Sequence, residues 1–220
     1  MSLFLLFKDE MKGFYKSKAM IVLWIGMPIL SILIHYFQPD TEGFPISYLV
    51  SLLIASIGGI LASVMLSTTI VSEKRRHVYD LYLIRQVKPR NILISKYLAV
   101  YFCLIIAALI SLLLGLLIDY YIMDTINESI LKETLESLSI SFNAMSISCA
   151  AGILIATLVK SVPLAAVLSI YVGNQLSMLS ITPSIFLENI DPILFTTIIG
   201  ISATLGAMII SIIIFNRKIE

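Results

Sequence analysis

The chain has 220 residues, a formal net charge of +1, and a composition that is 59% hydrophobic and only 13% charged. Its mean hydropathy of +0.99 exceeds that of soluble proteins, in which apolar residues make up about half of the total. This excludes an ordinary soluble domain. Apolar runs of about 20 residues instead match the length of helix that crosses a hydrocarbon layer of about 30 Å.

The first predicted element is an amphipathic helix over residues 1–18. At helical spacing one face carries apolar side chains and the other carries lysines, which is typical of a helix lying in a membrane interface. The alternative is a disordered basic leader that only sets topology. The apolar face consists of Leu3, Phe7, Met11 and Phe14.

Six transmembrane helices are predicted behind it. They cover residues 19–37, 46–70, 92–118, 138–159, 162–181 and 193–215. The N-terminus, the 71–91 loop, Lys96, the Lys160 turn and the C-terminal tail hold fourteen of the fifteen Lys and Arg residues. By the positive-inside rule both termini face the cytoplasm. We therefore expect an all-α, polytopic protein of the cell membrane, with one transmembrane domain over residues 1–220.

Sequence motifs for catalysis or metal binding are absent. There is no HExxH metal pair and no GxSxG nucleophile turn, and His35 and His77 have no evident catalytic partner. Cys103 and Cys149 lie inside apolar runs and are expected to be buried free thiols. We expect no catalytic residue, no metal site and no nucleic-acid partner. No charged residue lies in the middle of a predicted span, so any uphill transport would draw its energy from another protein.

Two groups of polar residues lie inside or at the end of predicted spans. Tyr171, Asn174 and Gln175 lie in the fifth span, and His35 and Tyr36 lie at the outer end of the first. Helix–helix hydrogen bonds or interfacial anchoring would explain them. The alternative is that they line a substrate path or a dimer interface. The same alternatives apply, more weakly, to Asn143 and Thr196–Thr197.

Charge is concentrated in the stretch VSEKRRHVYDLYLIRQVKPRN (71–91), which carries six of the fifteen Lys and Arg residues. Residues 72–88 lack Pro and Gly, so a single cytoplasmic helix is predicted there, and Pro89 would end it and open the next span. A loop that only sets topology explains the cations. It does not explain the apolar and aromatic side chains between them, which would contact lipid headgroups or, as we favour, a soluble partner.

The order of these residues resembles that of the ABC-2 type permeases, the membrane subunits of ATP-binding-cassette exporters. A span is followed by Glu and basic residues, a helix, a short turn and then Ile-Leu-x-x-Lys. The matching residues are Glu73, Lys74, Arg75, Arg76, Leu81, Leu83, Val87, Lys88, Pro89, Arg90, Asn91, Ile92, Leu93 and Lys96. His77 departs from the pattern, because the family usually has Gly near this position.

The resemblance implies that residues 72–88 form a coupling helix that docks on a separate ATPase. Two ATPase subunits would pair with two permease chains, identical or paralogous. ATP and Mg would bind the ATPases, and this chain would need no cofactor. The docking residues would be Glu73, Arg76, Val78, Tyr79, Leu81, Tyr82 and Arg85. The substrate path would run between the two permeases and involve His35, Tyr36, Tyr171, Asn174 and Gln175.

The function expected from the resemblance is export of an amphipathic or hydrophobic substrate, such as a peptide, lipid or drug. Two other classes of protein stay open. One is the six-helix membrane component of an importer, which captures a small molecule within one chain. The other is an immunity or sensor protein that binds a peptide without moving it.

Overall fold

The computed structural model describes residues 3–37, 46–79, 87–123, 128–186 and 192–219, and the regular elements within these ranges are all helices. This confirms the all-α class. The helices are α1 (Leu3–Tyr15), α2 (Lys18–Phe37), α3 (Ile46–Arg75), α5 (Pro89–Met123), α6 (Glu128–Leu158), α7 (Val162–Phe186) and α8 (Pro192–Ile219).

Four helices are long and apolar enough to cross a membrane, within the part of the chain that the structure describes. They are α3, α5, α6 and α8, with candidate spans at Ser56–Arg75, Pro89–Ile118, Thr134–Leu158 and Ile193–Arg217. The chain is therefore a membrane-embedded helical protein. Helices also form at the first and fifth predicted spans, as α2 and α7. Six crossings with both termini cytoplasmic stay a prediction.

Local sequence explains where several helices begin. Pro89 opens α5, as predicted, and Pro192 opens α8, because proline lacks the N–H that a first helical turn leaves unpaired. The side chain of Ser17 accepts a hydrogen bond from the Met20 backbone N–H at 3.2 Å and so caps α2. α6 begins at Glu128 rather than at residue 138. No proline or glycine interrupts residues 128–138, and acidic residues are favoured near a helix N-terminus.

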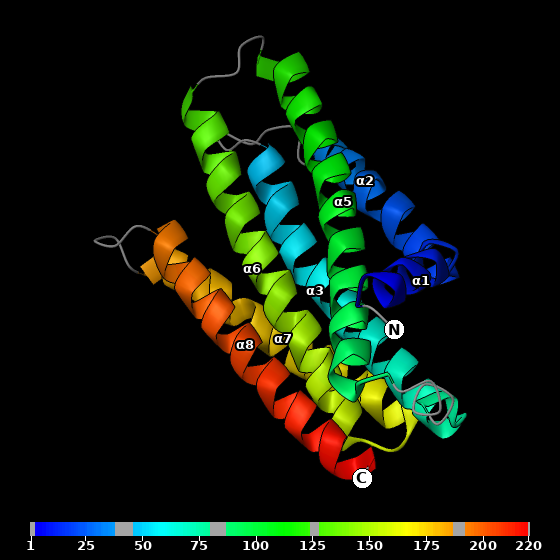
Figure 1. Ribbon diagram of the computed structural model, residues 1–220. Helices are drawn as coiled ribbons and strands as arrows, with labels where there is room; N and C mark the ends of the chain where they lie inside the picture. Colours follow the sequence, from blue (N-terminus) through cyan, green and yellow to red (C-terminus); the bar gives the residue numbers. More distant parts are fainter. Residues whose placement is uncertain (1–2, 38–45, 80–86, 124–127, 187–191, 220) are drawn as a thin grey trace.

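The bundle is arranged around α3 and α6, which pack extensively on each other (Figure 1). α7 packs on α3 and α6, and α8 packs mainly on α6. On the other side α5 packs on α3, and α1 and α2 pack on α5. In Figure 1 the short helix α1 lies across α5 rather than along it.

Three helices approach closely at Ser63 of α3. A Cβ atom added to Gly152 of α6 would lie 2.6 Å from the Ser63 carbonyl oxygen, and one added to Gly173 of α7 would lie 3.0 Å from the Ser63 Cβ. Only glycine leaves room for this. Small residues at such crossings let membrane helices gain van der Waals contact, since the surrounding lipid offers no hydrophobic driving force for association.

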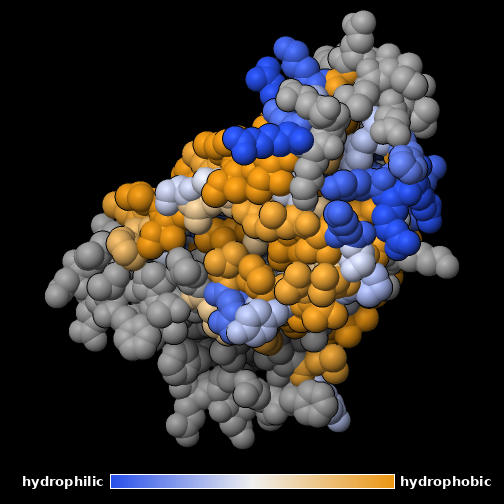
Figure 2. Space-filling view, turned by 90° about the horizontal axis from the view of Figure 1, so that it is seen from below, coloured by the Kyte–Doolittle hydropathy of each residue, from blue (hydrophilic) through white to orange (hydrophobic). Residues whose placement is uncertain are grey.

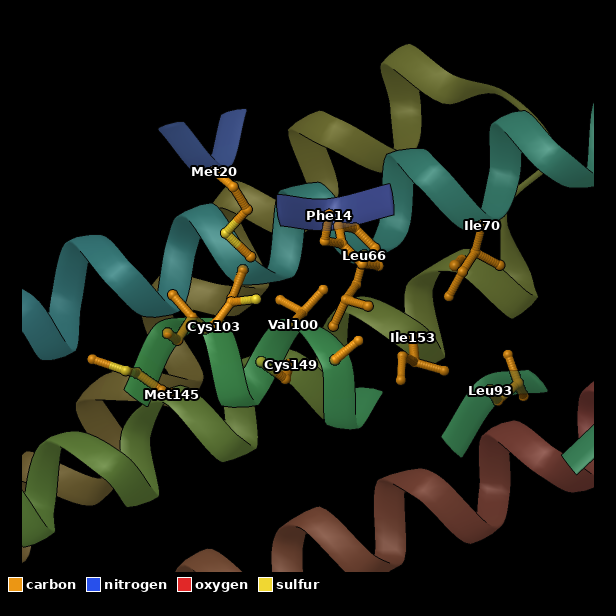
Figure 3. Close-up of a cluster of buried hydrophobic side chains, with 14 of the residues drawn as sticks. Phe14, Met20, Leu66, Ile70, Leu93, Val100, Cys103, Met145, Cys149 and Ile153 are labelled. Atoms are coloured by element: carbon orange, nitrogen blue, oxygen red, sulfur yellow. The ribbon is translucent and has the colours of Figure 1, made fainter. Parts of the chain in front are cut away.

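A buried apolar cluster joins all seven helices of the described part of the chain, and Figure 3 shows a portion of it. Phe14 of α1, Met20 of α2, Leu66 of α3, Val100 of α5 and Met145 of α6 all belong to it. Cys103 and Cys149 are also members, and both are buried free thiols, as predicted. The N-terminal segment is therefore part of the packed protein.

The surface separates apolar from charged side chains. Ile198, Ile201, Leu205 and Ile209 on α8 are all more than half exposed, as expected of a lipid-facing helix. Seen from the end at which α3, α6 and α8 stop, hydrophilic side chains gather in patches beside a broad apolar surface (Figure 2).

The crossing at Ser63 predicts unequal effects of two similar substitutions. Gly152→Ala should destabilise the protein by about 1–3 kcal/mol, because the added methyl meets backbone that has to move. Gly206→Ala is the matched control: nothing lies within 4 Å of its added Cβ, and alanine favours helix. Thermal unfolding of the purified protein in detergent measures both. Equal unfolding temperatures for the two variants would contradict the close approach.

Candidate functional site

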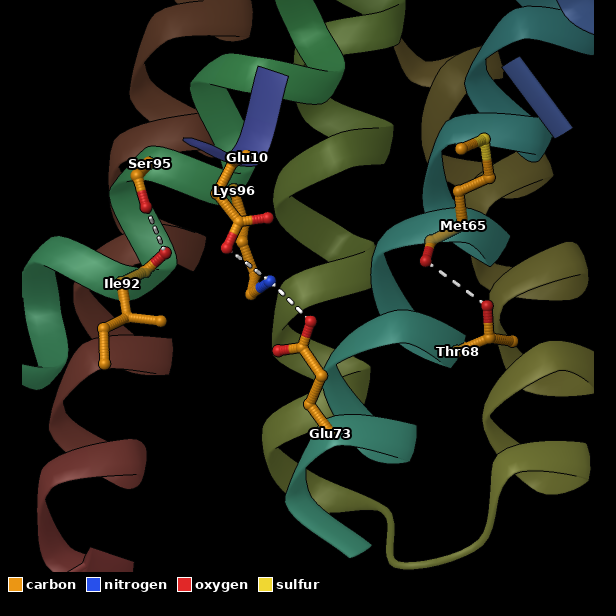
Figure 4. A network of polar contacts seen from close by, with 7 residues as sticks. All are labelled: Glu10, Met65, Thr68, Glu73, Ile92, Ser95 and Lys96. Atoms are coloured by element: carbon orange, nitrogen blue, oxygen red, sulfur yellow. Dashed lines mark hydrogen bonds and ion pairs between the residues drawn. The ribbon is translucent and has the colours of Figure 1, made fainter. Parts of the chain in front are cut away.

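Lys96 is the centre of a charged junction between three helices (Figure 4). Its Nζ lies 2.7 Å from Glu10 Oε1 and 2.8 Å from Glu73 Oε1. Glu10 comes from α1, Glu73 from the last turn of α3, and Lys96 from the beginning of α5. The Lys96 side chain is only 1% exposed, so the ammonium exchanges its hydration for two charge-assisted hydrogen bonds.

Neighbouring contacts on α1 position Glu10. Phe7 packs edge-on to Phe102 of α5, with ring centroids 6.4 Å apart. The Cys103 thiol lies 3.7 Å from the sulfur of Met11. These contacts fall on either side of Glu10 in the sequence and hold this face of α1 against α5. The carboxylate of Glu10 is thereby directed at Lys96.

The junction holds two carboxylates for one ammonium. Burial raises the pKa of Glu10 above its ordinary value, and the nearby charges of Glu73 and Asp9 add to this, whereas Lys96 opposes it. The second carboxylate oxygen of Glu73, Oε2, is buried and has no hydrogen-bond partner among the described residues. The junction therefore stabilises charge incompletely and is sensitive to protonation.

The chain turns sharply after α3. α3 ends at Arg75, and His77 has a left-handed backbone with φ of 55°. The prediction of one helix over residues 72–88 is therefore wrong at its beginning: residues 72–75 continue α3, and a left-handed residue cannot continue a right-handed helix. Glycine adopts a left-handed conformation without steric cost. A left-handed residue at position 77 is therefore compatible with the glycine that the ABC-2 permease pattern usually has near this position.

The predicted docking residues have different environments. Arg76 is exposed and Val78 is half-buried. Both line a groove of about 480 Å³ together with Glu73 and residues of α3 and α7. Tyr79 is buried and packs edge-on to Phe215 at the end of α8, with ring centroids 5.3 Å apart. Leu81, Tyr82 and Arg85 lie outside the described residues.

The predicted path residues are not part of this junction. Tyr171 and Gln175 lie on an exposed face of α7, and Asn174 beside them is half-buried. Tyr36 is exposed on α2, while the His35 side chain lies outside the described part. α2 and α7 lie on different sides of the bundle (Figure 1). A single chain thus does not bring these residues together.

Polar residues inside the bundle form a separate network between helices. The hydroxyls of Tyr97 and Ser146 lie 2.7 Å apart, and those of Ser146 and Thr204 lie 3.0 Å apart, which joins α5, α6 and α8. Asn143 donates to the backbone carbonyl of Ser139 at 3.0 Å and to the Thr197 hydroxyl at 3.4 Å. For Asn143 and Thr197 these bonds favour a role in helix–helix packing over a role in lining a substrate path.

The part of the chain that the structure describes contains no cluster of three or more His, Cys, Asp or Glu side chains placed to hold a metal ion. No protein-family model matches the chain, and no curated protein matches it in sequence.

Sequence reasoning missed Glu10 and the pairing of Lys96. A usable signal was present, because Lys96 follows four residues after the start of an otherwise apolar predicted span. A buried cation requires a carboxylate partner. The identity of that partner depends on how α1 packs on α5, since Glu10 lies 86 residues away in the sequence.

Removing the ammonium should strongly destabilise the junction. Lys96→Met leaves two partly buried carboxylates without a cation, and breaking a buried ion pair in this way typically costs about 3–5 kcal/mol. The triple variant Lys96→Met, Glu10→Gln, Glu73→Gln should recover much of the loss. Thermal unfolding tests this, with Lys132→Met, at an exposed lysine, as control. A triple variant no more stable than Lys96→Met alone would contradict the cluster.

The raised pKa of Glu10 predicts the direction of a pH effect. Folded Glu10 keeps its proton to higher pH than unfolded Glu10 does, so its contribution to stability is lost as the pH rises above about 4.5 and through the folded pKa. Glu10→Gln does not titrate. Between about pH 4 and pH 7 the unchanged protein should therefore lose stability relative to this variant. Unfolding temperatures across that range measure the effect, Glu136→Gln is the control, and a pH-independent difference would refute it.

Proposed function

We propose that this chain is the membrane permease subunit of an ABC-2 type exporter, driven by a separate ATPase. The observation that carries the proposal is the ion pair between Glu73 and Lys96, 2.8 Å long. These are the charged residues at the beginning and end of the motif that resembles the family. Their direct contact joins the end of α3 to the beginning of α5, the two helices between which the segment lies.

The ion pair between Glu73 and Lys96 supports a role in coupling for the segment between α3 and α5. A displacement of residues 76–88 would act on α3 through Glu73 and on α5 through Lys96, and Lys96 would pass it to α1 through Glu10. The contact of Tyr79 with Phe215 adds α8. In this proposal ATP-driven closure of two ATPases moves the segment, and the helices tilt with it.

The buried and exposed residues suggest a division of tasks within the segment. Glu73 and Tyr79 face this chain's own helices and would anchor the segment. Exposed Arg76 would contact the ATPase, together with Leu81, Tyr82 and Arg85, which the sequence predicts for the docking face. Docking thus involves fewer residues than the sequence pattern alone suggested.

The outward-facing polar residues suit a path between two permease chains. Tyr171 and Gln175 on α7 and Tyr36 on α2 are exposed on one chain, so a second copy or a paralogue would be needed to enclose them. The predicted His35 and Asn174 lie next to them in sequence. Uncharged polar and apolar groups would favour an amphipathic or hydrophobic substrate over ions or sugars.

Copurification from native membranes tests the docking segment. The tagged chain should retain an ATPase subunit that contains the phosphate-binding sequence G-x-x-x-x-G-K-[ST]. The variants Arg76→Glu, Tyr82→Asp and Arg85→Glu should lose that subunit while the chain itself still inserts into the membrane. Arg217→Glu, an exposed cation at the end of α8, is the control and should retain it. Absence of such an ATPase from the unchanged complex would exclude the proposal and favour an importer component or a sensor.

A further inference from the structure

An apolar groove of about 400 Å³ lies where α1 passes into α2. It is lined by Tyr15, Lys16, Met20, Ile21, Trp24 and Ile25. Tyr15 packs edge-on to Trp24, with ring centroids 5.5 Å apart, and forms one wall. Ile21 and Ile25 are about half exposed along α2, so the groove continues onto an open apolar helix face.

Two polar groups of the groove have no partner among the residues that the structure describes. Among the described residues, Lys16 is the only charged one that lines the groove; it is exposed and forms no ion pair with another described residue. The indole Nε1 of Trp24 is buried and has no hydrogen-bond acceptor among the described residues. An indole N–H without an acceptor and an ammonium that line the same groove would both be stabilised by a ligand with negatively charged oxygen atoms. The other lining side chains are apolar and would bind a hydrocarbon chain.

We propose that this groove binds an anionic glycerophospholipid. An acyl chain lies along Ile21 and Ile25, and the phosphate lies at Lys16, whose stem packs on the apolar wall while its ammonium reaches the headgroup. A small rotation of the Trp24 ring gives its N–H an ester or phosphate oxygen. The site is independent of any ATPase partner.

The position of the groove favours a lipid over a soluble anion or a second copy of the chain. Tyr and Trp side chains are typical of the membrane–water boundary, where lipid phosphates and esters lie. The exposed face of α1 also carries Lys8, Asp9 and Lys12, while Glu10 is paired with Lys96, so with Lys16 three cations here outnumber one exposed acid. The resulting positive surface attracts anionic lipids, which are concentrated in the cytoplasmic leaflet.

Trp24 is the only tryptophan of the chain, so its fluorescence reports on the groove alone. The full-length protein is reconstituted into bilayers containing brominated phosphatidylglycerol or brominated phosphatidylcholine, each diluted with the corresponding unbrominated lipid. Bromine quenches indole fluorescence only at close range. Brominated phosphatidylglycerol, competing against phosphatidylcholine, should quench Trp24 at a several-fold lower mole fraction than brominated phosphatidylcholine does.

The variants identify the cation responsible. Lys16→Gln should reduce the preference for phosphatidylglycerol about fivefold, the usual effect of one lysine near an anionic surface, and Lys16→Arg should retain it. Lys12→Gln is the matched control, since Lys12 is exposed on α1, four residues before Lys16, but does not line the groove. Equal quenching by the two lipids would overturn the proposal. So would weak quenching by both, which would mean that protein covers the groove, or a preference that Lys12→Gln and Lys16→Gln reduce equally.

Discussion

The buried ammonium of Lys96 determines how the charged end of this bundle is built. An ammonium removed from water is costly unless carboxylates replace its hydration, and here they come from two other helices. α1, the end of α3 and the beginning of α5 therefore have to keep their relative positions. Burial is the main cause that raises the pKa of Glu10, and the second carboxylate, that of Glu73, adds to it, whereas Lys96 opposes it.

The middle of the bundle depends on a different interaction. Ser63 and Gly152 allow α3 and α6 to approach until backbone meets backbone, and Gly173 lets α7 pack closely on the Ser63 side chain. Apolar side chains alone do not select partners among helices in lipid, so close packing of small residues and hydrogen bonds such as that between Tyr97 and Ser146 take this role. The outer faces, as on α8, remain apolar and face lipid.

The charged junction at Lys96 bears directly on the proposed function. The segment after α3 begins beside Glu73, which is paired with Lys96 of α5, and Lys96 is also paired with Glu10 of α1. Tyr79 of the segment contacts α8. A partner that acted on the segment would therefore reach helices on both sides of the bundle. The proposed lipid groove lies at the C-terminal end of α1, the helix that supplies Glu10. The groove and the proposed docking segment therefore adjoin one connected set of helices, although lipid binding at the groove does not depend on an ATPase.

The sequence by itself determined which segments are helical and apolar, because run length, proline positions and the placement of lysine and arginine are local properties. It located α2, α3, α5, α7 and α8 closely and predicted both buried thiols. Three features were decided only by the tertiary structure: the pairing of Lys96 with Glu10, the break at His77, and the exposed face of α7 that carries Tyr171. The pairing and the exposed face depend on which helices pack together, and residues far apart in the sequence carry no local mark of that contact. The break at His77 is a left-handed backbone conformation that is uncommon for a residue other than glycine, so the residue type did not predict it.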